Sequence, residues 1–502
     1  MKAHTAVTVI APFVGVAQAA SAGGVIQWDI QKDQRPRDLT RLGRRASTFE
    51  EVISNEQARG GYFATCRLGT PGQNLTLQLD TGSSDIWVPD SESRVCREAA
   101  AGGCDFGSFN PSRSRTFKVT REGEFDIEYV DGSSSRGDYF TDVFEIGGAT
   151  LQNMTMGLGL ETSIPYGLVG VGYALNEAIV GQTRSGSSVY PNLPVQMVNE
   201  GLISTVAYSL WLNDLDSSSG NILFGGIDTE KYKGELTRID VYPTQPNLFT
   251  SFRVALTSLH AVSPSGSDTL TSDTFPIPVI LDSGTTLSYL PTDLATQVWG
   301  EVGAIYSAQF QLAVIPCRME NSKGYFSFGL AGSNGPRINV TMDELVLDLT
   351  TGQPPVFSTG PYEGQDACQF GIQNFTSAPY LLGDTFLRSA YVVYDLINNQ
   401  IGIAATDFNS TDSNIIAFPS LGAHIPSATA APDQSQVTSG SSPSVTALSY
   451  DARPGFMDLG GADDDGASAA SAVPPAFWNI QMLLVGFSMF FTMFGPGLFL
   501  AV

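Results

Sequence analysis

A block of ten residues that occurs twice decides the fold of this chain. The first copy reads Asp80-Thr-Gly-Ser-Ser-Asp-Ile-Trp-Val-Pro89, and the second reads Asp282-Ser-Gly-Thr-Thr-Leu-Ser-Tyr-Leu-Pro291. The copies align without a gap, and each follows a short apolar run. Farther along, each copy is followed by two apolar residues and a glycine, Leu168-Val169-Gly170 and Leu381-Leu382-Gly383. Chance is a poor explanation for this match, so we expect two similar lobes related by a pseudo-twofold axis.

The chain around the repeat has the pattern of an all-β protein. Short apolar runs, many of them rich in β-branched or aromatic residues, are separated by Gly, Pro, Asn and Asp. We expect an N-terminal lobe over residues 57–235, a C-terminal lobe over residues 236–408, and a central cleft between them. Expected strands are Leu75–Leu79, Phe125–Tyr129, Ile222–Phe224, Val279–Leu281, Leu345–Leu349 and Tyr391–Tyr394, and the better candidates for short helices are Val195–Glu200 and Leu294–Val302.

Composition limits the partners. The 502 residues carry a formal net charge of -24. Nucleic-acid binding requires clustered Lys and Arg, so we expect no nucleic-acid partner. Solubility outside the cell explains such a charge, and so does use in acid, where protonation of carboxylates relieves their mutual repulsion. We expect the chain to act as a monomer.

The repeat also predicts chemistry. A pseudo-twofold axis brings Asp80 and Asp282 face to face, and two carboxylates that close share one proton and titrate as a pair. The ionised member can then take a proton from a water while the protonated member polarises a peptide carbonyl. This reaction needs no metal and no cofactor. A single copy of the first three residues of the block, Asp-Thr-Gly or Asp-Ser-Gly, would also fit an ordinary turn, because Asp and Gly favour turns.

The residues beside each aspartate fit a supporting role. The glycine at the third position of each copy allows a sharp turn and a close approach of backbone N–H groups to the aspartate. One pair of hydroxyls could form a network across the two aspartates, and another could hold the outer carboxylate oxygens. The expected supporting residues are Thr81, Gly82 and Ser83 in the first copy and Ser283, Gly284 and Thr285 in the second.

The chain lacks the residues that other classes of hydrolase need. A serine or cysteine hydrolase needs a histidine base, and the chain contains only His4, His260 and His424. No H-E-x-x-H zinc motif is present. A glycoside hydrolase also uses two carboxylates but does not need this repeated block. The remaining rival is a binding protein that keeps the same fold without activity.

These motifs resemble the pepsin family of aspartic peptidases over about Gly61 to Phe408. The resemblance rests on the repeat, on Gly61-Tyr62-Phe63 with Leu68-Gly69-Thr70-Pro71, on Tyr129-Val130-Asp131-Gly132-Ser133, and on Leu381 to Arg388 with Tyr394-Asp395. It implies a bilobal fold and an aspartic endopeptidase acting on proteins or peptides. It also implies a flap hairpin with Tyr129, Asp131 and Gly132 as substrate-binding residues, and Trp87 as the partner of the flap tyrosine. Val130 departs from the family's usual flap glycine.

The N-terminus has the features of an exported protein. Residues 1–19 carry Lys2 and an apolar run that ends in small residues, as in a signal peptide. A buried strand is the alternative. Residues 20–45 are rich in arginine and end in Arg44-Arg45. We interpret them as a pro-segment with a dibasic processing site, although a basic surface stretch has the same composition.

The C-terminus predicts a membrane anchor. Residues 409–475 are rich in Ser, Ala, Pro, Gly and Asp and lack hydrophobic periodicity, so we interpret them as a disordered stalk. Small residues, a spacer and the uncharged tail 476–502 follow the pattern of a GPI-anchor signal. A permanent transmembrane helix is the alternative, but no basic residue follows the tail. With the stalk and the dibasic pair, this resembles the fungal cell-surface branch, the yapsins and candidapepsins. We expect the protein on the outer face of the plasma membrane or in the cell wall.

Cysteines and glycosylation triplets point to the same compartment. Two local disulfides, Cys96–Cys104 and Cys317–Cys368, would suit an oxidising environment and leave Cys66 as a free thiol. Five N-x-[ST] triplets are candidate glycan sites, namely Asn74, Asn153, Asn339, Asn374 and Asn409.

Overall fold

A computed structural model describes most of the central part of the chain. The described residues are 24–32, 61–98, 103–183, 186–217, 219–272, 275–350, 353–432, 434 and 448–459. The expected signal peptide 1–19, the processing pair Arg44 and Arg45, and the hydrophobic tail 476–502 lie outside these residues. Within the described part, no helix is long and apolar enough to cross a membrane.

β-Strands are the main regular structure of the described residues and helices are few, which confirms the predicted all-β class. The largest sheet has fourteen strands. In sheet order they are β28 (Thr429–Ala430), β12 (Tyr232–Asp240), β26 (Gln400–Thr406), β25 (Ala390–Asp395), β9 (Ala207–Trp211), β10 (Ser219–Phe224), β1 (Ile26–Lys32), β2 (Tyr62–Leu68), β3 (Gln73–Asp80), β8 (Gly167–Gly170), β4 (Ile86–Pro89), β7 (Ala149–Thr162), β6 (Ser134–Ile146) and β5 (Lys118–Glu128).

The second half of the chain builds smaller sheets. An eight-stranded sheet contains β20 (Arg337–Thr341), β19 (Tyr325–Leu330), β13 (Arg253–Ser263), β15 (Ile277–Leu281), β24 (Tyr380–Leu382), β16 (Ser288–Pro291) and β23 (Ile372–Phe375), with β14 (Gly266–Leu270) paired to β13. A four-stranded sheet contains β17 (Ile305–Ser307), β18 (Leu312–Pro316), β22 (Ala367–Phe370) and β21 (Val346–Leu347). A two-stranded sheet joins β11 (Gly226–Asp228) to β27 (Ile415–Ala417).

Helices are short and lie between the strands. The α-helices are α2 (Arg94–Arg97), α3 (Ala178–Thr183), α4 (Leu193–Asn199), α5 (Thr292–Val302), α6 (Asp384–Leu387) and α7 (Arg453–Met457). The 3-10 helices are η3 (Pro111–Arg113), η4 (Ala174–Asn176), η5 (Gly186–Ser188), η6 (Cys317–Asn321) and η7 (Met342–Glu344). The two helices expected from the sequence correspond to α4 and α5.

The strand pairing repeats in the two halves, as the repeated block predicts. In the first half β3 pairs with β8 in parallel, β4 pairs with β8 antiparallel, and β4 pairs with β7 in parallel. In the second half β15 pairs with β24 in parallel, β16 pairs with β24 antiparallel, and β16 pairs with β23 in parallel. Each half therefore places the end of its motif strand in the same environment.

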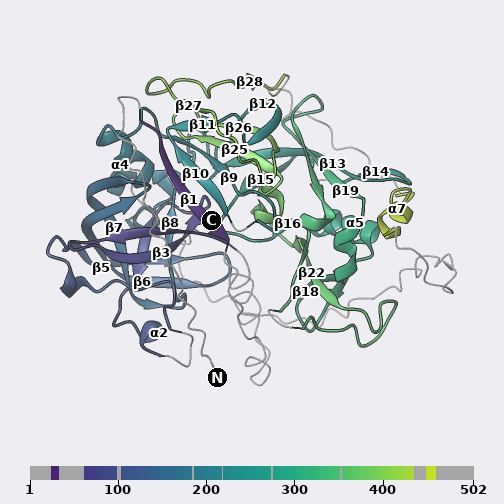
Figure 1. Ribbon diagram of the computed structural model, residues 1–502, viewed down its shortest axis with the longest axis horizontal. Coiled ribbons are helices and arrows are strands. Elements are labelled where there is room, and N and C mark those ends of the chain that lie inside the picture. The colour runs from purple at the N-terminus through teal and green to yellow at the C-terminus, as the bar shows by residue number, and fades with distance from the viewer. Residues whose placement is uncertain are drawn as a thin grey trace, which may run out of the picture.

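Two lobes and a shared central layer are visible in Figure 1. Strands β3 to β8 lie in one lobe, β13, β15, β16 and α5 lie in the other, and β9, β10, β25 and β26 lie between and above them. Strands from both halves of the sequence pair in this layer, because β25 pairs with β9. The expected boundary at residues 235 and 236 falls inside β12, which belongs to the shared layer.

Strand β1 lies within the expected pro-segment. It pairs antiparallel with β10 from Ile26 to Gln31, and its end pairs with β2. Alternate side chains Ile26, Trp28 and Ile30 are buried in the main core. This part of the expected pro-segment is therefore a central strand of the largest sheet.

The interpretation of residues 409–475 as a disordered stalk is wrong for two parts of this range, residues 409–432 and residues 448–459. Strand β27 pairs with β11, and β28 pairs in parallel with β12. Phe418 and Ile425 are buried in a cluster with side chains of β9 and β25. These isolated apolar residues lack periodicity because they fill separate places on the surface of a finished sheet, so composition alone missed them.

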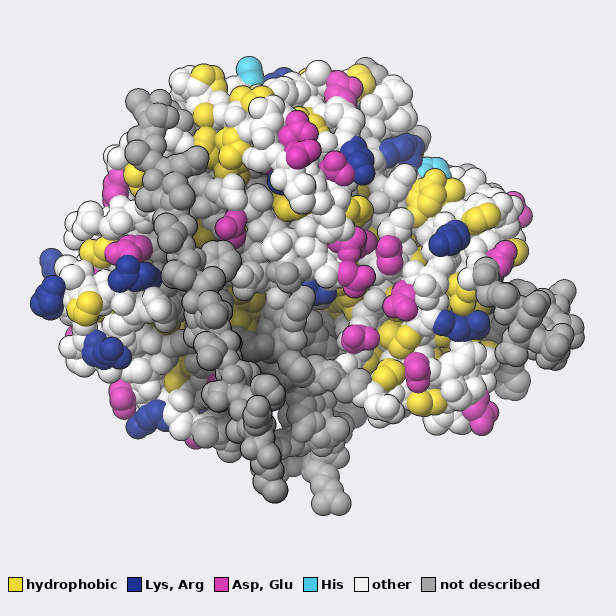
Figure 2. Space-filling view, viewed as in Figure 1, with side chains coloured by type: hydrophobic (Ala, Val, Ile, Leu, Met, Phe, Trp, Pro, Cys, Tyr) yellow, Lys and Arg dark blue, Asp and Glu magenta, His cyan; other side chains and the backbone are white. Residues whose placement is uncertain are grey.

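The structure contains both predicted disulfides and exposes four of the five candidate glycosylation sites. The two disulfides Cys96–Cys104 and Cys317–Cys368 are present, and Cys66 is a buried free thiol. Of the five triplets, Asn374 is half-buried, and the exposed ones are Asn74, Asn153, Asn339 and Asn409. Asp and Glu side chains are spread over the face shown in Figure 2, and the Lys and Arg side chains described on that face form no continuous patch.

Candidate active site

The two motif aspartates lie at equivalent ends of equivalent strands. Asp80 is the last residue of β3, and Asp282 directly follows β15. Both strands are packed on both faces, and both carboxylates are almost completely buried, with 4% and 6% of the residue surface exposed. The pairing with β8 and β24 fixes the backbone at these two positions.

Each carboxylate is held by its own turn in the same way. The backbone N–H of Gly82 donates to Asp80 Oδ1 over 2.8 Å, and the Ser83 hydroxyl donates to Oδ2. In the second copy the N–H of Gly284 donates to Asp282 Oδ1 over 2.9 Å, and the Thr285 hydroxyl donates to Oδ2 over 2.6 Å. The hydroxyls and glycines expected to orient the carboxylates occupy these positions.

The glycines also show how close the two aspartates lie. A Cβ added to Gly82 would meet Asp282 Oδ1 at 2.5 Å, and a Cβ added to Gly284 would overlap Asp80 Oδ1. Each carboxylate therefore packs directly against the turn that carries the other. Any side chain at either glycine would push the two carboxylates apart.

A hydrogen-bond network joins the two motifs beneath the carboxylates. The Thr81 hydroxyl donates to the Leu281 carbonyl over 3.0 Å and accepts the N–H of Ser283 over 3.0 Å. The Ser283 hydroxyl donates to the Leu79 carbonyl over 3.2 Å and accepts the N–H of Thr81 over 3.2 Å. Each motif thus gives and receives the same two bonds, so the two lobes meet with near-twofold symmetry at this point.

Burial changes the acidity of both aspartates. Desolvation comes first and the neighbouring Asp282 second in raising the pKa of Asp80. Desolvation also raises the pKa of Asp282, against the hydrogen bond from Thr285. Because the two groups are coupled, the pair keeps a proton at a pH where isolated aspartates would both be ionised.

A hairpin of the first lobe carries Tyr129 and the predicted flap turn. Strands β5 and β6 are joined by a tight turn in which Gly132 has a φ of +80°, and Asp131 accepts the N–H of Ser133 over 2.9 Å. The Trp87 indole N–H donates to the Tyr129 hydroxyl over 2.8 Å. Burial first and the charge of Asp80 second raise the pKa of Tyr129, so this hydroxyl stays protonated near the dyad.

A polar cluster behind this hairpin was not expected from the sequence. Buried Asp85 accepts the hydroxyls of Tyr139 over 3.1 Å and Tyr190 over 2.7 Å, and the N–H of Ala178 over 2.8 Å. Burial first and Asp85 second raise the pKa of nearby Glu177 to about 9. The rings of Tyr139 and Phe125 meet edge to face and support the wall that carries Trp87.

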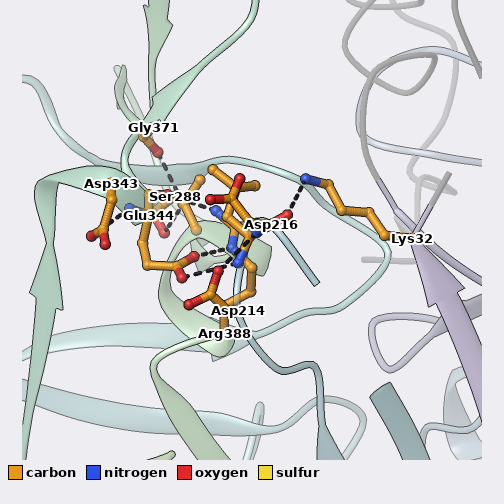
Figure 3. A network of polar contacts seen from close by, with 10 residues as sticks. Lys32, Asp214, Asp216, Ser288, Asp343, Glu344, Gly371 and Arg388 are labelled. Atoms are coloured by element: carbon orange, nitrogen blue, oxygen red, sulfur yellow. Dashed lines mark hydrogen bonds and ion pairs between the residues drawn. The ribbon is translucent and has the colours of Figure 1, made fainter. Parts of the chain in front are cut away.

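A second buried network includes Arg388, which directly follows helix α6 (Figure 3). Arg388 and Glu344 form an ion pair, with 2% of each side chain exposed, and Arg388 Nη2 donates to the Glu344 carbonyl over 2.6 Å. The N–H of Leu215 donates to Glu344 Oε1 over 3.1 Å, and Lys32 Nζ donates to the Leu215 carbonyl over 2.8 Å. Strand β1 is thereby tied to the loop that follows β9.

Two further residues contact the motif turns directly. The Gln78 side-chain amide donates to the Gly284 carbonyl over 3.2 Å, and the Asn176 amide donates to the Gly82 carbonyl over 3.0 Å. Gln78 precedes Asp80 by two residues and so shares its face of β3, a signal that the sequence contained. Asn176 comes from η4, far from the motif in sequence, and had no such signal.

Other catalytic chemistry has no support among the described residues. His260 lies on β13, where its Nδ1 is 3.1 Å from the Thr269 hydroxyl of β14. No group of His, Cys, Asp and Glu suited to a metal ion occurs in the described ranges. The two aspartates are therefore the buried acidic pair to which both halves of the fold contribute equally.

Comparison with known proteins agrees with this geometry. The family model described as eukaryotic aspartyl protease matches residues 61–406. The chain is 42% identical over 414 residues to "Probable aspartic-type endopeptidase OPSB" of Arthroderma benhamiae, covering 82% of each chain. It is 33% identical over 405 residues to "Aspartic proteinase yapsin-3" of Saccharomyces cerevisiae, covering 79% of this chain and 75% of the relative. The chain is thus an aspartic-type endopeptidase and belongs to the eukaryotic aspartyl protease family.

Proposed function

We propose that this endopeptidase works in acid at the cell surface and hydrolyses peptide bonds with a water activated jointly by Asp80 and Asp282. The observation that carries the mechanism is the mutual packing of the two carboxylates, in which each touches the glycine of the other motif. Two carboxyl groups so placed can hold one proton and one water between them. Aspartic proteases are the established example of such a pair.

The steps of the reaction follow from the shared proton. The ionised aspartate takes a proton from the water, and the protonated aspartate donates a hydrogen bond to the scissile carbonyl. The water oxygen bonds to the carbonyl carbon while the carbonyl oxygen takes the proton of the protonated aspartate, which gives a tetrahedral diol. The C–N bond then breaks as one aspartate gives a proton to the leaving nitrogen and the other takes a proton from a diol hydroxyl, so the dyad returns to its singly protonated state.

The hairpin has a defined role in this mechanism. Tyr129, Asp131 and Gly132 close over a peptide bound across the dyad, and the bond from Trp87 holds the Tyr129 hydroxyl in place. Burial raises the pKa values of Asp80 and Asp282, so the pair keeps its shared proton in acid and up to a higher pH than isolated aspartates would. Above that pH the dyad loses its shared proton.

Peptide cleavage tests this mechanism directly. The purified chain is incubated with a mixture of internally quenched peptides at mildly acidic pH, beside Asp282→Asn and the exposed control Asp105→Asn. We expect cleavage by the wild type and by Asp105→Asn, and a rate at least about a thousandfold lower for Asp282→Asn. If Asp282→Asn cleaves like the wild type, the two-aspartate mechanism is wrong. If no form cleaves, the proposal that the enzyme hydrolyses such peptides in acid is wrong.

The proposed location rests on several sequence features and two structural ones. Residues 1–19 direct export, residues 20–45 form a pro-segment whose strand β1 must leave the largest sheet once the chain is cut after Arg45, and residues 476–502 direct attachment of a GPI anchor. Two disulfides and four exposed glycosylation triplets suit an oxidising secretory pathway. The catalytic lobes would then lie outside the cell on a lipid tether.

Release from intact cells tests the anchor. Cells expressing the chain are treated with a phosphatidylinositol-specific phospholipase, and peptidase activity is measured in the medium. A GPI anchor predicts that activity moves from the cells to the medium, whereas a permanent transmembrane helix predicts that it stays with the cells. N-terminal sequencing of the released enzyme tests whether processing follows Arg45.

A further inference from the structure

After its last described strand, β28, the chain packs against the C-terminal lobe once more. Residues 448–459, which we call the C-terminal clip, lie against β13, β14 and α5 and include the short helix α7. Ala452 and Phe456 of the clip are fully buried, and Leu448, Met457 and Leu459 pack against the same core. This segment lies beyond the family match, which ends at residue 406.

Polar side chains of the lobe hold the backbone of the clip. Asp268 of β14 accepts the N–H of Ala452 over 2.8 Å and the Ser449 hydroxyl over 2.7 Å. Ser263 donates to the Ala452 carbonyl over 2.6 Å, and Ser265 donates to the Asp451 carbonyl over 2.6 Å. Such bonds depend on the backbone of the clip being in one register.

Glycines of the lobe leave room for the aromatic side chains of the clip. Phe456 stacks on Phe326, with ring centroids 5.4 Å apart, and a Cβ at Gly324 would overlap the Phe456 ring. A Cβ at Gly300 of α5 would meet the Tyr450 ring at 2.8 Å. The Ser322 hydroxyl donates to the Phe456 carbonyl over 2.8 Å and closes the site.

These contacts have the features of a binding site for a short peptide. They combine an aromatic anchor in a fitted cavity, a row of backbone hydrogen bonds and a buried acidic group. Each of these contacts joins a described residue of the clip to a described residue of the lobe, and residues 435–447 connect the clip to the preceding part of the chain. We therefore propose that the clip binds the C-terminal lobe as a non-covalent peptide ligand, so that the chain beyond Leu459 stays attached when the connection at 435–447 is cut.

The proposal goes beyond the peptidase function and does not depend on it. Its consequence is that proteolysis of the connecting segment would not separate the catalytic lobes from residues 460–502. A cut at this position would release the enzyme only if the clip also left its site. The affinity of the clip, rather than the covalent link, then decides release.

Cutting the full chain at one place tests the proposal. A recognition sequence for a site-specific protease is inserted between Thr438 and Ser439, the protein is cut, and the two pieces are separated by gel filtration in mild detergent. We expect the pieces to elute together in the wild type and in the control Gly186→Ala, where an added Cβ would contact the Leu175 side chain at 3.4 Å and nothing in the clip. We expect at least about tenfold more free C-terminal piece in Phe456→Ala and in Gly324→Ala.

Peptidase activity and competition complete the test. Phe456 belongs to α7 at the outer side of its lobe (Figure 1), so Phe456→Ala should keep its activity, which shows that the lobes are folded. If a variant does not fold, competition decides on the wild type: an excess of a synthetic peptide of residues 447–460 should displace the cut piece, and the same peptide with Phe456→Ala should not. Immediate separation of the wild-type pieces, or equal displacement by both peptides, would overturn the proposal.

Discussion

Thr81 and Ser283 exchange hydrogen bonds across the boundary between the lobes, each accepting the backbone N–H of the other. Each hydroxyl also donates to a carbonyl of the opposite motif strand. The two aspartates sit directly above this exchange. Their relative position is therefore set by neutral hydrogen bonds that remain when the carboxylates titrate.

Replacing Thr81 with valine should destabilise the protein and lower its activity. Valine has a similar shape but leaves the Ser283 N–H and the Leu281 carbonyl unpartnered in a buried place. Each such group costs about 1 to 3 kcal/mol. Urea unfolding should show a loss of about 2 kcal/mol or more, against less than about 0.5 kcal/mol for Thr76→Val on the same strand. Equal stability of the two variants would contradict the role of the exchange.

The bond between Trp87 and Tyr129 should act as one unit in catalysis. Trp87→Phe and Tyr129→Phe each remove the same 2.8 Å hydrogen bond from a different side. A net bond of about 1 to 1.5 kcal/mol predicts a fall in kcat/KM of about tenfold for each variant. The double variant should fall little further. Losses that multiply in the double variant would show that the two side chains act separately.

Glu177 should make the protein less stable as the pH rises. Burial and the nearby Asp85 raise its pKa from 4.5 to about 9, so the folded state favours the protonated form. The stabilising contribution is complete below about pH 4.5 and is lost as the pH rises toward 9. By about pH 7 the loss reaches at most about 3 kcal/mol.

Glu177→Gln tests this pH dependence, because the neutral amide cannot ionise. Urea unfolding at about pH 4 and about pH 7.5 should show a smaller difference in stability for Glu177→Gln than for the wild type. Exposed Glu122→Gln serves as the control and should behave like the wild type. An unchanged difference in Glu177→Gln would show that other groups cause the loss.

Removing the two disulfides should have unequal effects. Cys317–Cys368 closes a loop with a sequence separation of 51, and Cys96–Cys104 closes one of 8. Loop-closure entropy gives about 4 kcal/mol for the longer loop and about 2.5 kcal/mol for the shorter one. Thermal unfolding of the two double-serine variants should rank them in this order. The reverse order would mean that native contacts, rather than loop length, dominate.

Local repetition made the dyad predictable from the sequence. Both aspartates, both glycines and all four hydroxyls stand in one short block, so a single comparison of the chain with itself finds them. The flap turn was predictable for the same reason, because Asp131-Gly132 is a strong hairpin signal. In each case the residues that touch are close together in the sequence or related by the repeat.

Contacts between distant segments were not predictable in this way. Strand β1 pairs with β10, and the clip around Phe456 packs on β13 and β14. No pattern in the sequence near Phe456 indicates which residues it contacts. Asp85 appeared only as a polar position in the motif, because its partners Tyr139 and Tyr190 come from other elements. A Ser- and Pro-rich composition concealed the few apolar residues that fix the chain after residue 409.

The most direct test of the central claim is the rate of peptide hydrolysis by Asp80→Asn, Asp282→Asn and the double variant. If the two carboxylates act as one unit on one water, each single variant should lose at least about a thousandfold in kcat and the double variant should lose little more. Folding of each variant is checked by its thermal unfolding. A single variant that keeps activity near that of the wild type, or losses that multiply in the double variant, would contradict a shared dyad.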